Sequence, residues 1–398
     1  MTKTDQSSAI PLDTTARLPA VTYVLTFCIA VIGSNSLVLG PIAPEVARSL
    51  GTSVALVMSA SAAFGLGTAA SALLMARHVD RLGARRMLLG ALLGLAAALA
   101  LSALAPAVPA LALTQLAAGV ASGIALPAIY AGAAAVAPPG RESRTIGVVL
   151  TGWTLSMVAG VSLSALVADL VHWRAVYAVV ALLAFGAFAT LKTSRYRDAP
   201  AAGSAPWPLA ALRIGGVKPL LVACAAFMSA FYGIYGYLGD HLHSALGEPV
   251  SANGIVALVY GIGFGAAALL DGVVDRLGAR RVMPFAFLAV AAVYLGFALA
   301  GGSFAFVLVI TFLWGLSNHF GLNVLIMRLA AIDPARRGTI MGLNSAVTYL
   351  AVFAGTTGFG PLYASQGFEM AALAALVLML VAAAAGSWRL PASATPRN

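Results

Sequence analysis

The sequence predicts an all-α integral membrane protein whose twelve transmembrane helices form two six-helix bundles. Three observations support this fold class. Hydrophobic residues make up 61% of the 398-residue chain and charged residues only 9%, whereas soluble domains carry about a quarter charged residues. Apolar runs long enough to cross a bilayer recur along the chain, and one seven-residue string occurs twice. This composition excludes an ordinary soluble enzyme and a disordered chain.

Each of twelve apolar runs approaches or exceeds the length of about 20 residues that an α-helix needs to cross the hydrocarbon. The first run is too long for the apolar region of a cleaved signal peptide, and no small-residue cleavage site follows it. We expect spans over 19–40, 53–76, 87–105, 109–136, 146–168, 174–191, 219–239, 252–270, 282–300, 304–327, 340–362 and 369–387.

The connection between the sixth and seventh spans is the longest one on its side of the membrane. It contains Pro200, Pro206 and Pro208 among small residues, a composition typical of linkers. We therefore expect an N-terminal six-helix bundle over 1–191, a cytoplasmic linker over 192–218 and a C-terminal six-helix bundle over 219–398.

The positive charges predict the orientation of the chain in the membrane. With the N-terminus in the cytoplasm, all of the 23 Lys and Arg residues except Arg48 and Arg174 lie on the inner side, as the positive-inside rule requires. We expect a multi-pass protein of a bacterial-type inner (cytoplasmic) membrane with both termini in the cytoplasm. The net charge of +10 then needs no nucleic-acid partner.

A duplicated string marks the connections after the second and eighth spans. Asp80–Arg86 and Asp275–Arg281 have the same seven residues, 195 positions apart. Parallel repeats of this kind are typical of one large class of secondary transporters. The acidic residue can accept hydrogen bonds from arginine, and the glycine permits a tight reversal. We expect a cytoplasmic gate made of Asp80, Arg81, Gly83, Arg85, Asp275, Arg276, Gly278 and Arg280.

These residues resemble the signature loop of the major facilitator superfamily, whose pattern is roughly G-x-x-x-D-R-x-G-R-[RK]. The leading glycine is replaced by Ala76 in the first copy and by Asp271 in the second. The resemblance extends over the whole chain and implies the major facilitator fold, a small-molecule substrate and alternating access. It also implies that the first helix of each three-helix unit lines the central pathway.

Within that superfamily the chain is most similar to the drug:proton antiporter and arabinose-efflux-permease group. Residues 41–51 resemble the outer loop that this group has after its first span, and Trp173-Arg174 resembles the pair before its sixth span. Two positions depart from the group. Gln115 stands where the fourth span carries arginine, and Ser162 stands where the antiporter pattern of the fifth span has proline.

Polar and aromatic residues interrupt several spans, and polar groups inside a membrane normally face the bundle interior or a watered cavity. The expected substrate or proton pathway comprises Asn35, Gln115, Trp153, Tyr232, Tyr235, Trp314, Asn318, His319, Asn323 and Asn344. Tyr237 is a further candidate, with a position at the outer membrane interface as its alternative.

His319 is the most specific candidate, because imidazole is the side chain whose unperturbed pKa lies near neutrality. It lies near the middle of the tenth span, with Asn323 one turn further on. By elimination among the titratable residues it is the expected proton carrier, with Asp271 second. An interhelical hydrogen bond without a role in transport is the alternative for His319.

The chain contains no motif for ATP binding or for nucleophilic or metal catalysis. His241, His243 and Glu248 are metal-ligand types in one outer connection, but their spacing is loose, and we expect neither a metal nor another cofactor. Cys28 and Cys224 lie within apolar runs and are not expected to form a disulfide.

The prediction is therefore a secondary active transporter, not an enzyme, that acts as a monomer and exports a small organic molecule with proton coupling. The alternatives are an uptake permease or uniporter of a small metabolite and, from another class, a non-transporting membrane sensor.

Overall fold

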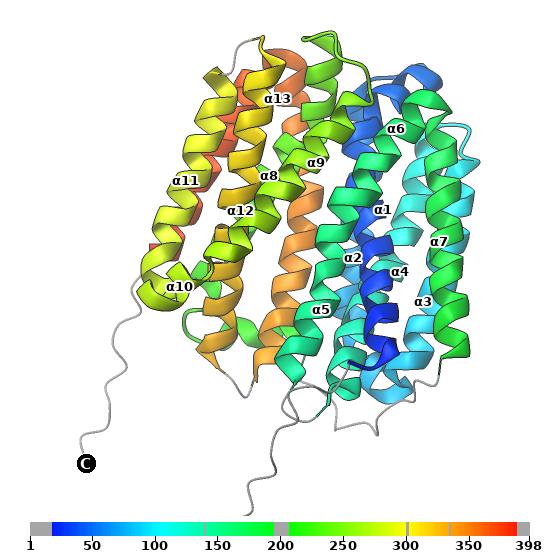
Figure 1. Ribbon diagram of the computed structural model, residues 1–398, viewed down its shortest axis with the longest axis vertical. Helices are drawn as coiled ribbons and strands as arrows, with labels where there is room; N and C mark the ends of the chain where they lie inside the picture. The colour runs from blue at the N-terminus through cyan, green and yellow to red at the C-terminus, as the bar shows by residue number, and fades with distance from the viewer. Residues whose placement is uncertain (1–17, 139–140, 195–206, 300–301, 334–335, 388–398) are drawn as a thin grey trace, which may run out of the picture.

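The computed structural model describes residues 18–138, 141–194, 207–299, 302–333 and 336–387, and the regular structure within these ranges is entirely helical (Figure 1). The helices are α1 Ala20–Leu50, α2 Val54–Leu82, α3 Ala84–Ala103, α4 Val108–Val136, α5 Glu142–Leu155, π-helix η1 Ser156–Val161, α6 Ser162–Leu170, α7 Trp173–Thr193, 3₁₀-helix η2 Pro208–Arg213, α8 Val217–Ser244, α9 Ala252–Ala267, 3₁₀-helix η3 Ala268–Leu270, α10 Gly272–Leu277, α11 Ala279–Leu299, α12 Phe304–Ile332 and α13 Arg337–Ser387.

Eleven helical stretches in the described ranges are long and apolar enough to cross a membrane. The last, α13, has 51 residues and contains a non-helical break at Gly367, with φ 80° and ψ −177°. The break falls in the connection expected between the eleventh and twelfth spans. Because α13 thus supplies two crossings and the other ten stretches supply one each, the predicted set of twelve transmembrane helices is confirmed.

The helices divide into two groups that follow the two halves of the chain. In the first half α4 packs against α2 and α3, α3 against α7, and α1 against α5. In the second half α13 packs against α8 and α11, while α12 packs against α9 and α11. Figure 1 shows the first group, from blue to green, beside the second, from green to red.

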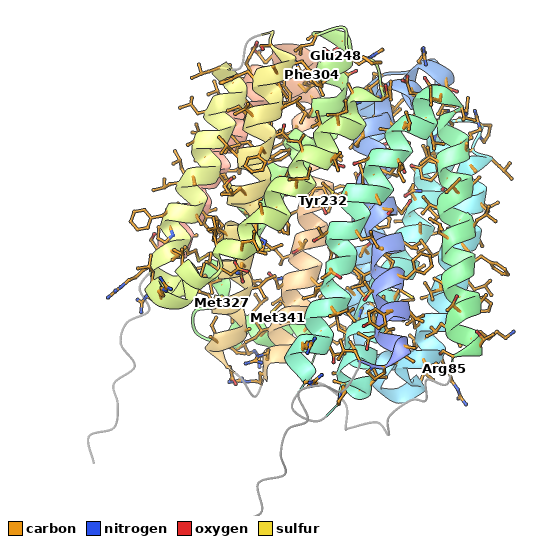
Figure 2. All side chains as sticks on the ribbon, viewed as in Figure 1. Arg85, Tyr232, Glu248, Phe304, Met327 and Met341 are labelled. Atoms are coloured by element: carbon orange, nitrogen blue, oxygen red, sulfur yellow. The ribbon has the colours of Figure 1, made fainter. Side chains whose placement is uncertain are left out.

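Both groups have the same two ends. We call the end that holds Glu248 and Phe304 the upper end and the end that holds Arg85 and Met341 the lower end (Figure 2). Large apolar side chains such as Leu182 on α7 and Phe285 on α11 point outward and are exposed. An apolar outer surface of this kind suits contact with lipid.

The two groups meet along a seam where glycines allow close packing. A Cβ placed at Gly40 on α1 would lie 2.9 Å from the carbonyl oxygen of Tyr235 on α8. Asn253 on α9 donates a hydrogen bond of 2.7 Å from Nδ2 to the carbonyl oxygen of Pro41. Small residues permit such backbone approach in membranes, where packing rather than the hydrophobic effect holds helices together.

The first outer loop was predicted over 41–51, and this prediction is wrong. Helix α1 continues through Pro41 and Pro44 as far as Leu50 and ends at Gly51, which has φ 62°. Residues 41–47 are buried against neighbouring helices, where unpaired backbone groups would be costly, so the helix persists despite the prolines. Glu45 lies in this buried part and pairs with Arg48.

Candidate transport pathway and proton site

A histidine and a carboxylate meet directly in the second half of the chain. His319 Nε2 on α12 lies 2.9 Å from Oδ1 of Asp271. The same oxygen accepts a hydrogen bond of 2.9 Å from Nδ2 of Asn323, one turn further along α12. The side chain of His319 is 14% exposed and that of Asp271 37% exposed. The pair is therefore partly buried, and the carboxylate is its more exposed member.

Asp271 owes its position to a break in the eighth span. Helix α9 ends at Ala267, the tighter turn η3 follows, and Asp271 then precedes the short helix α10. The Asp271 carbonyl accepts a hydrogen bond of 2.9 Å from the Val274 N–H, which starts α10. This break turns the chain so that the Asp271 carboxylate points at α12.

The surroundings of His319 determine which of its nitrogens can take up a proton. An N–H at Nε2 donates to Asp271, whereas Nδ1 is buried and has no partner among the described residues. The ring of Phe264 packs edge-on against the imidazole, with centroids 4.9 Å apart. The neutral imidazole thus offers a free lone pair at Nδ1, and protonation there produces an imidazolium beside a carboxylate.

The sequence placed His319 and Asn323 on one stripe of α12, and the structure brings both to Asp271. Trp314 and Asn318, on the neighbouring stripe, instead face the interior of the second half. Trp314 Nε1 donates to the Tyr294 hydroxyl at 3.2 Å, and Asn318 Nδ2 donates to the Tyr260 hydroxyl at 3.1 Å. Both side chains are buried and hold α12 to α11 and α9.

An aromatic cluster surrounds Phe231 on α8. Its ring contacts Tyr232, Tyr235, Tyr260 and Trp314 at centroid distances of 5.0 to 5.8 Å. The Tyr235 hydroxyl is buried without a partner among the described residues. Tyr232 lies at mid-height between the two halves (Figure 2). The cluster therefore presents ring faces and a free hydroxyl beside the seam.

Tyr237 does not lie at the membrane interface, so that alternative is wrong. Its side chain is fully buried, and its hydroxyl donates a hydrogen bond of 2.6 Å to the Thr356 carbonyl of α13. The ring also stacks on Tyr363, with centroids 5.0 Å apart. Tyr237 thus joins α8 to α13.

In the first half the polar candidates form a buried chain of hydrogen bonds. Asn35 Nδ2 on α1 donates to Gln115 Oε1 on α4 at 3.2 Å, and Gln115 Nε2 donates to the Ser102 hydroxyl on α3 at 3.1 Å. Gln115 is only 2% exposed. Asn35 and Gln115 thus tie three helices together, as expected of polar residues that join helices in a membrane.

Trp153 and Asn344 belong neither to the aromatic cluster around Phe231 nor to the hydrogen-bonded chain that contains Gln115. Trp153 on α5 is partly exposed and donates from Nε1 to the Tyr130 hydroxyl on α4 at 3.5 Å. Asn344, in the first part of α13, is buried, and its Oδ1 has no partner among the described residues. An unpaired buried carbonyl oxygen is available to a bound molecule.

The two copies of the repeated loop lie at the lower end. Gly83 and Gly278 both have positive φ values, of 90° and 83°, and both end one helix and begin the next. Arg85 donates from Nη2 to the Lys192 carbonyl at 2.9 Å, while Arg276 and Arg280 are exposed. Asp80 and Arg81 lie in helix α2 and Asp275 in α10, but these three side chains fall outside the part of the structure that is described.

Comparison with known proteins identifies the family. The model of the Major Facilitator Superfamily matches residues 25–356. The chain belongs to the major facilitator superfamily. It is therefore a multi-pass membrane transporter and not an enzyme, and the resemblance seen in the sequence is confirmed.

Two relatives and one solved structure show what this superfamily member is similar to. YwfA of Bacillus subtilis, an uncharacterised MFS-type transporter, is 24% identical over 357 residues, which cover 88% of this chain and 87% of YwfA. A chloramphenicol resistance protein of Streptomyces lividans is 28% identical over 269 residues, covering 66% and 68% of the two chains. The crystal structure of a bacterial homologue of the human lysosomal transporter Spinster, inward-facing and unoccupied, has a TM-score of 0.74 at 14% identity and covers 92% and 95%.

The π-helix η1 is a feature of this superfamily member that the sequence analysis missed. It spans Ser156–Val161, within the stretch that aligns with the antiporter pattern of the fifth span. A Cβ at Gly33 on α1 would lie 2.5 Å from the Ser156 hydroxyl oxygen, and a Cβ at Gly160 would collide with Ser34. The only signal in the sequence was this pair of glycines. Such π-turns are frequent at functional sites.

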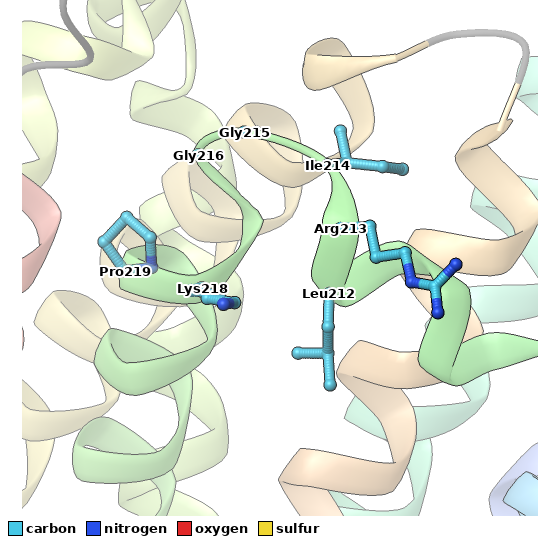
Figure 3. A pocket seen from close by; sticks show the side chains of 7 residues that line it. All are labelled: Leu212, Arg213, Ile214, Gly215, Gly216, Lys218 and Pro219. Atoms are coloured by element: carbon cyan, nitrogen blue, oxygen red, sulfur yellow. The ribbon is translucent and has the colours of Figure 1, made fainter.

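A pocket and a pair of histidines lie outside the set of pathway candidates. A pocket of about 250 Å³ at the lower end is lined by Leu212, Arg213, Ile214, Gly215, Gly216, Lys218 and Pro219 (Figure 3), and it shares no residue with the pathway candidates. Among the described residues, no three His, Cys, Asp or Glu side chains are grouped to hold a metal. His241 stacks on Phe368 instead, with centroids 4.4 Å apart.

Proposed function

We propose that this transporter exports a small organic molecule across the cytoplasmic membrane in exchange for protons, by alternating access of two six-helix bundles. The lower end faces the cytoplasm in this proposal, together with both termini and a linker over 192–218. The repeated loops at the lower end act as the cytoplasmic gate. The observation that carries the proposal is the contact between His319 and Asp271.

The pair has the properties that a proton carrier needs. Imidazole is the side chain that can exchange a proton near neutral pH, and Nε2 of His319 lies 2.9 Å from the Asp271 carboxylate. Glu45 lies five residues before the end of α1 and pairs with Arg48. Gln115 stands where the antiporter group has arginine, so the proposal assigns the coupling to another residue, His319 in the middle part of α12.

Two observations support export of a small organic molecule. The chain resembles the drug:proton antiporter group, and a relative that shares 28% identity is named a chloramphenicol resistance protein. The aromatic cluster around Phe231 and the partly exposed Trp153 offer ring faces near the seam. Ring faces bind flat or apolar parts of a molecule, and the free hydroxyl of Tyr235 and amide oxygen of Asn344 bind polar groups.

A two-step experiment tests this function. Thermal stabilisation of the purified protein by a panel of drugs and metabolites, with chloramphenicol included, first finds a ligand. Flux of that ligand is then measured in proteoliposomes of the wild-type protein, with and without an imposed pH gradient. We expect uphill flux only with the gradient, in the direction opposite to the protons. Flux that runs only downhill would favour a uniporter, and uphill flux along the direction of the protons would favour an uptake permease.

A further inference from the structure

The Asp271 carboxylate connects the proton site with the second copy of the gate loop. Asp271 takes the position of the leading glycine in that copy, four residues before Asp275, whereas the first copy has Ala76 there. Its side chain contacts α12 through His319 and Asn323. Its backbone carbonyl accepts from Val274 at the start of α10. The first half has no carboxylate at the matching position.

Asn323 shapes this contact without being able to titrate. Its Nδ2 and the Nε2 of His319 both lie 2.9 Å from Oδ1 of Asp271. An amide N–H that donates to a carboxylate stabilises the ionised form and fixes its direction. Because both donors use Oδ1, the carboxylate is held toward α12 in one orientation, and the start of α10 is held with it.

Few other charged groups surround the pair on the packed elements. Arg276 on α10 and Arg280 on α11 are exposed. Arg328 on α12 is bound to the Gly386 carbonyl and the sulfur of Met283. On α9 the Tyr260 hydroxyl accepts a hydrogen bond from Asn318. The side chain of Asp275 is outside the described part.

We propose that Asn323 is a positioning residue that holds Asp271 on His319, and that through Asp271 the proton state of this pair controls α10 and the second gate loop. The inference rests on the proton site proposed above. When the imidazole is protonated, its charge-assisted hydrogen bond to the Asp271 carboxylate is strong, and the two donors of α12 hold the start of α10. When the imidazole loses its proton, this hydrogen bond weakens and α10 is released at the lower end.

Alkylation of cysteines in the two copies of the loop tests this inference without a substrate. Leu277 on α10 and its repeat partner Leu82 on α2 are 54% and 55% exposed, so Leu277→Cys and Leu82→Cys form a matched pair. Native Cys28 and Cys224 are buried and should react slowly. The measured quantity is the rate of reaction with N-ethylmaleimide in Leu277→Cys divided by the rate in Leu82→Cys. The pH dependence of the thiol itself is common to both rates and cancels in this ratio. It is measured from about pH 5.5 to 8.5, which spans the imidazole titration.

We expect the ratio to change severalfold with pH in the wild-type background and to be independent of pH in His319→Gln. In Asn323→Ala the change of the ratio with pH should be smaller by about twofold or more, because the carboxylate has lost a donor that keeps it on α12. Asn323→Gln retains an amide and should restore this change toward the wild-type size.

A flat ratio in the wild-type background, or an unchanged pH response in Asn323→Ala, would overturn the inference. Membrane abundance of each variant separates loss of folding from loss of the pH response. If His319→Gln abolishes gradient-driven transport while the wild-type ratio is flat, the proposed function stands and only the link to α10 fails. If transport by His319→Gln remains coupled to protons, the proton site itself is wrong.

Discussion

Gly83 and Gly278, which lie 195 residues apart in the sequence, hold nearly the same backbone conformation, with φ 90°, ψ 135° and φ 83°, ψ 134°. Each glycine is the single residue between two helices, α2 and α3 in the first half and α10 and α11 in the second. The duplicated sequence has therefore kept a duplicated turn. Positive φ at these positions explains why both copies need glycine.

Alanine at either glycine should destabilise the protein by about 1–3 kcal/mol, because a side chain is strained at positive φ. Thermal unfolding in detergent should show a lower midpoint for Gly83→Ala and Gly278→Ala. Gly90 on α3 and Gly265 on α9 have open space around them and no positive φ, so Gly90→Ala and Gly265→Ala are the controls. Equal effects at all four positions would show that the turn conformation is not the cause.

The hydrogen bond from Asn253 to the Pro41 carbonyl should help to keep the seam between the two halves closed at the upper end. Asn253→Ala removes this buried bond, at a cost of about 1–2 kcal/mol, and should favour opening at the upper end. A cysteine in place of buried Ser36 on α1 would then react faster with an impermeant maleimide added from outside. Ser102→Cys, buried inside the first half, is the control. A similar rate increase at both sites would point to general loosening instead.

Gln115 should stabilise the first half rather than carry protons. Gln115→Leu removes both the acceptor of Asn35 and the donor to Ser102. The buried Asn35 amide then lacks this partner, at a cost of about 1–3 kcal/mol, whereas the Ser102 hydroxyl keeps its bonds to Ala98 and Thr114. We expect a lower unfolding midpoint while transport still responds to the pH gradient. Loss of that response at unchanged stability would assign Gln115 to the pathway instead.

Reporter fusions test the orientation that the charges predict. Fusions after Arg86 and Arg281, next to the two repeated turns, should report the cytoplasm. Fusions after Glu248 and after Gly51, where α1 ends, should report the outside. A cytoplasmic signal from Glu248 would contradict the proposed orientation.

The sequence was sufficient for the architecture, because span length, the positive charges and the Asp-Arg-Leu-Gly repeat each constrain it independently. The ends of helices were less predictable. Pro41 and Pro44 indicate a loop by local rules, but burial against neighbouring helices keeps α1 intact to Leu50. Likewise the π-helix η1 depends on how closely α1 packs on Gly160, and this is a tertiary property.

The candidate site could be predicted only in part. His319 and Asn323 were found because a histidine and an amide are rare and costly inside a span. Asp271 ranked below His319 because it lies near the end of an apolar run, and only the break at η3 turns it toward α12. Trp314 and Asn318 were expected in the pathway by residue type. Their hydrogen bonds to Tyr294 and Tyr260 inside the second half depend on the rotation of α12, and their place in the pathway stays a prediction.

The central claim is that the pair formed by His319 and Asp271 couples transport to protons, and flux of His319→Gln in proteoliposomes tests it most directly. Glutamine can still donate a hydrogen bond, but it cannot titrate. Ser317→Ala, which alters a buried residue of α12 outside the expected pathway, is the control. With an imposed pH gradient, we predict that His319→Gln retains substrate binding and downhill flux but no longer accumulates substrate uphill, whereas Ser317→Ala does. Uphill transport by His319→Gln driven by that gradient would contradict the account.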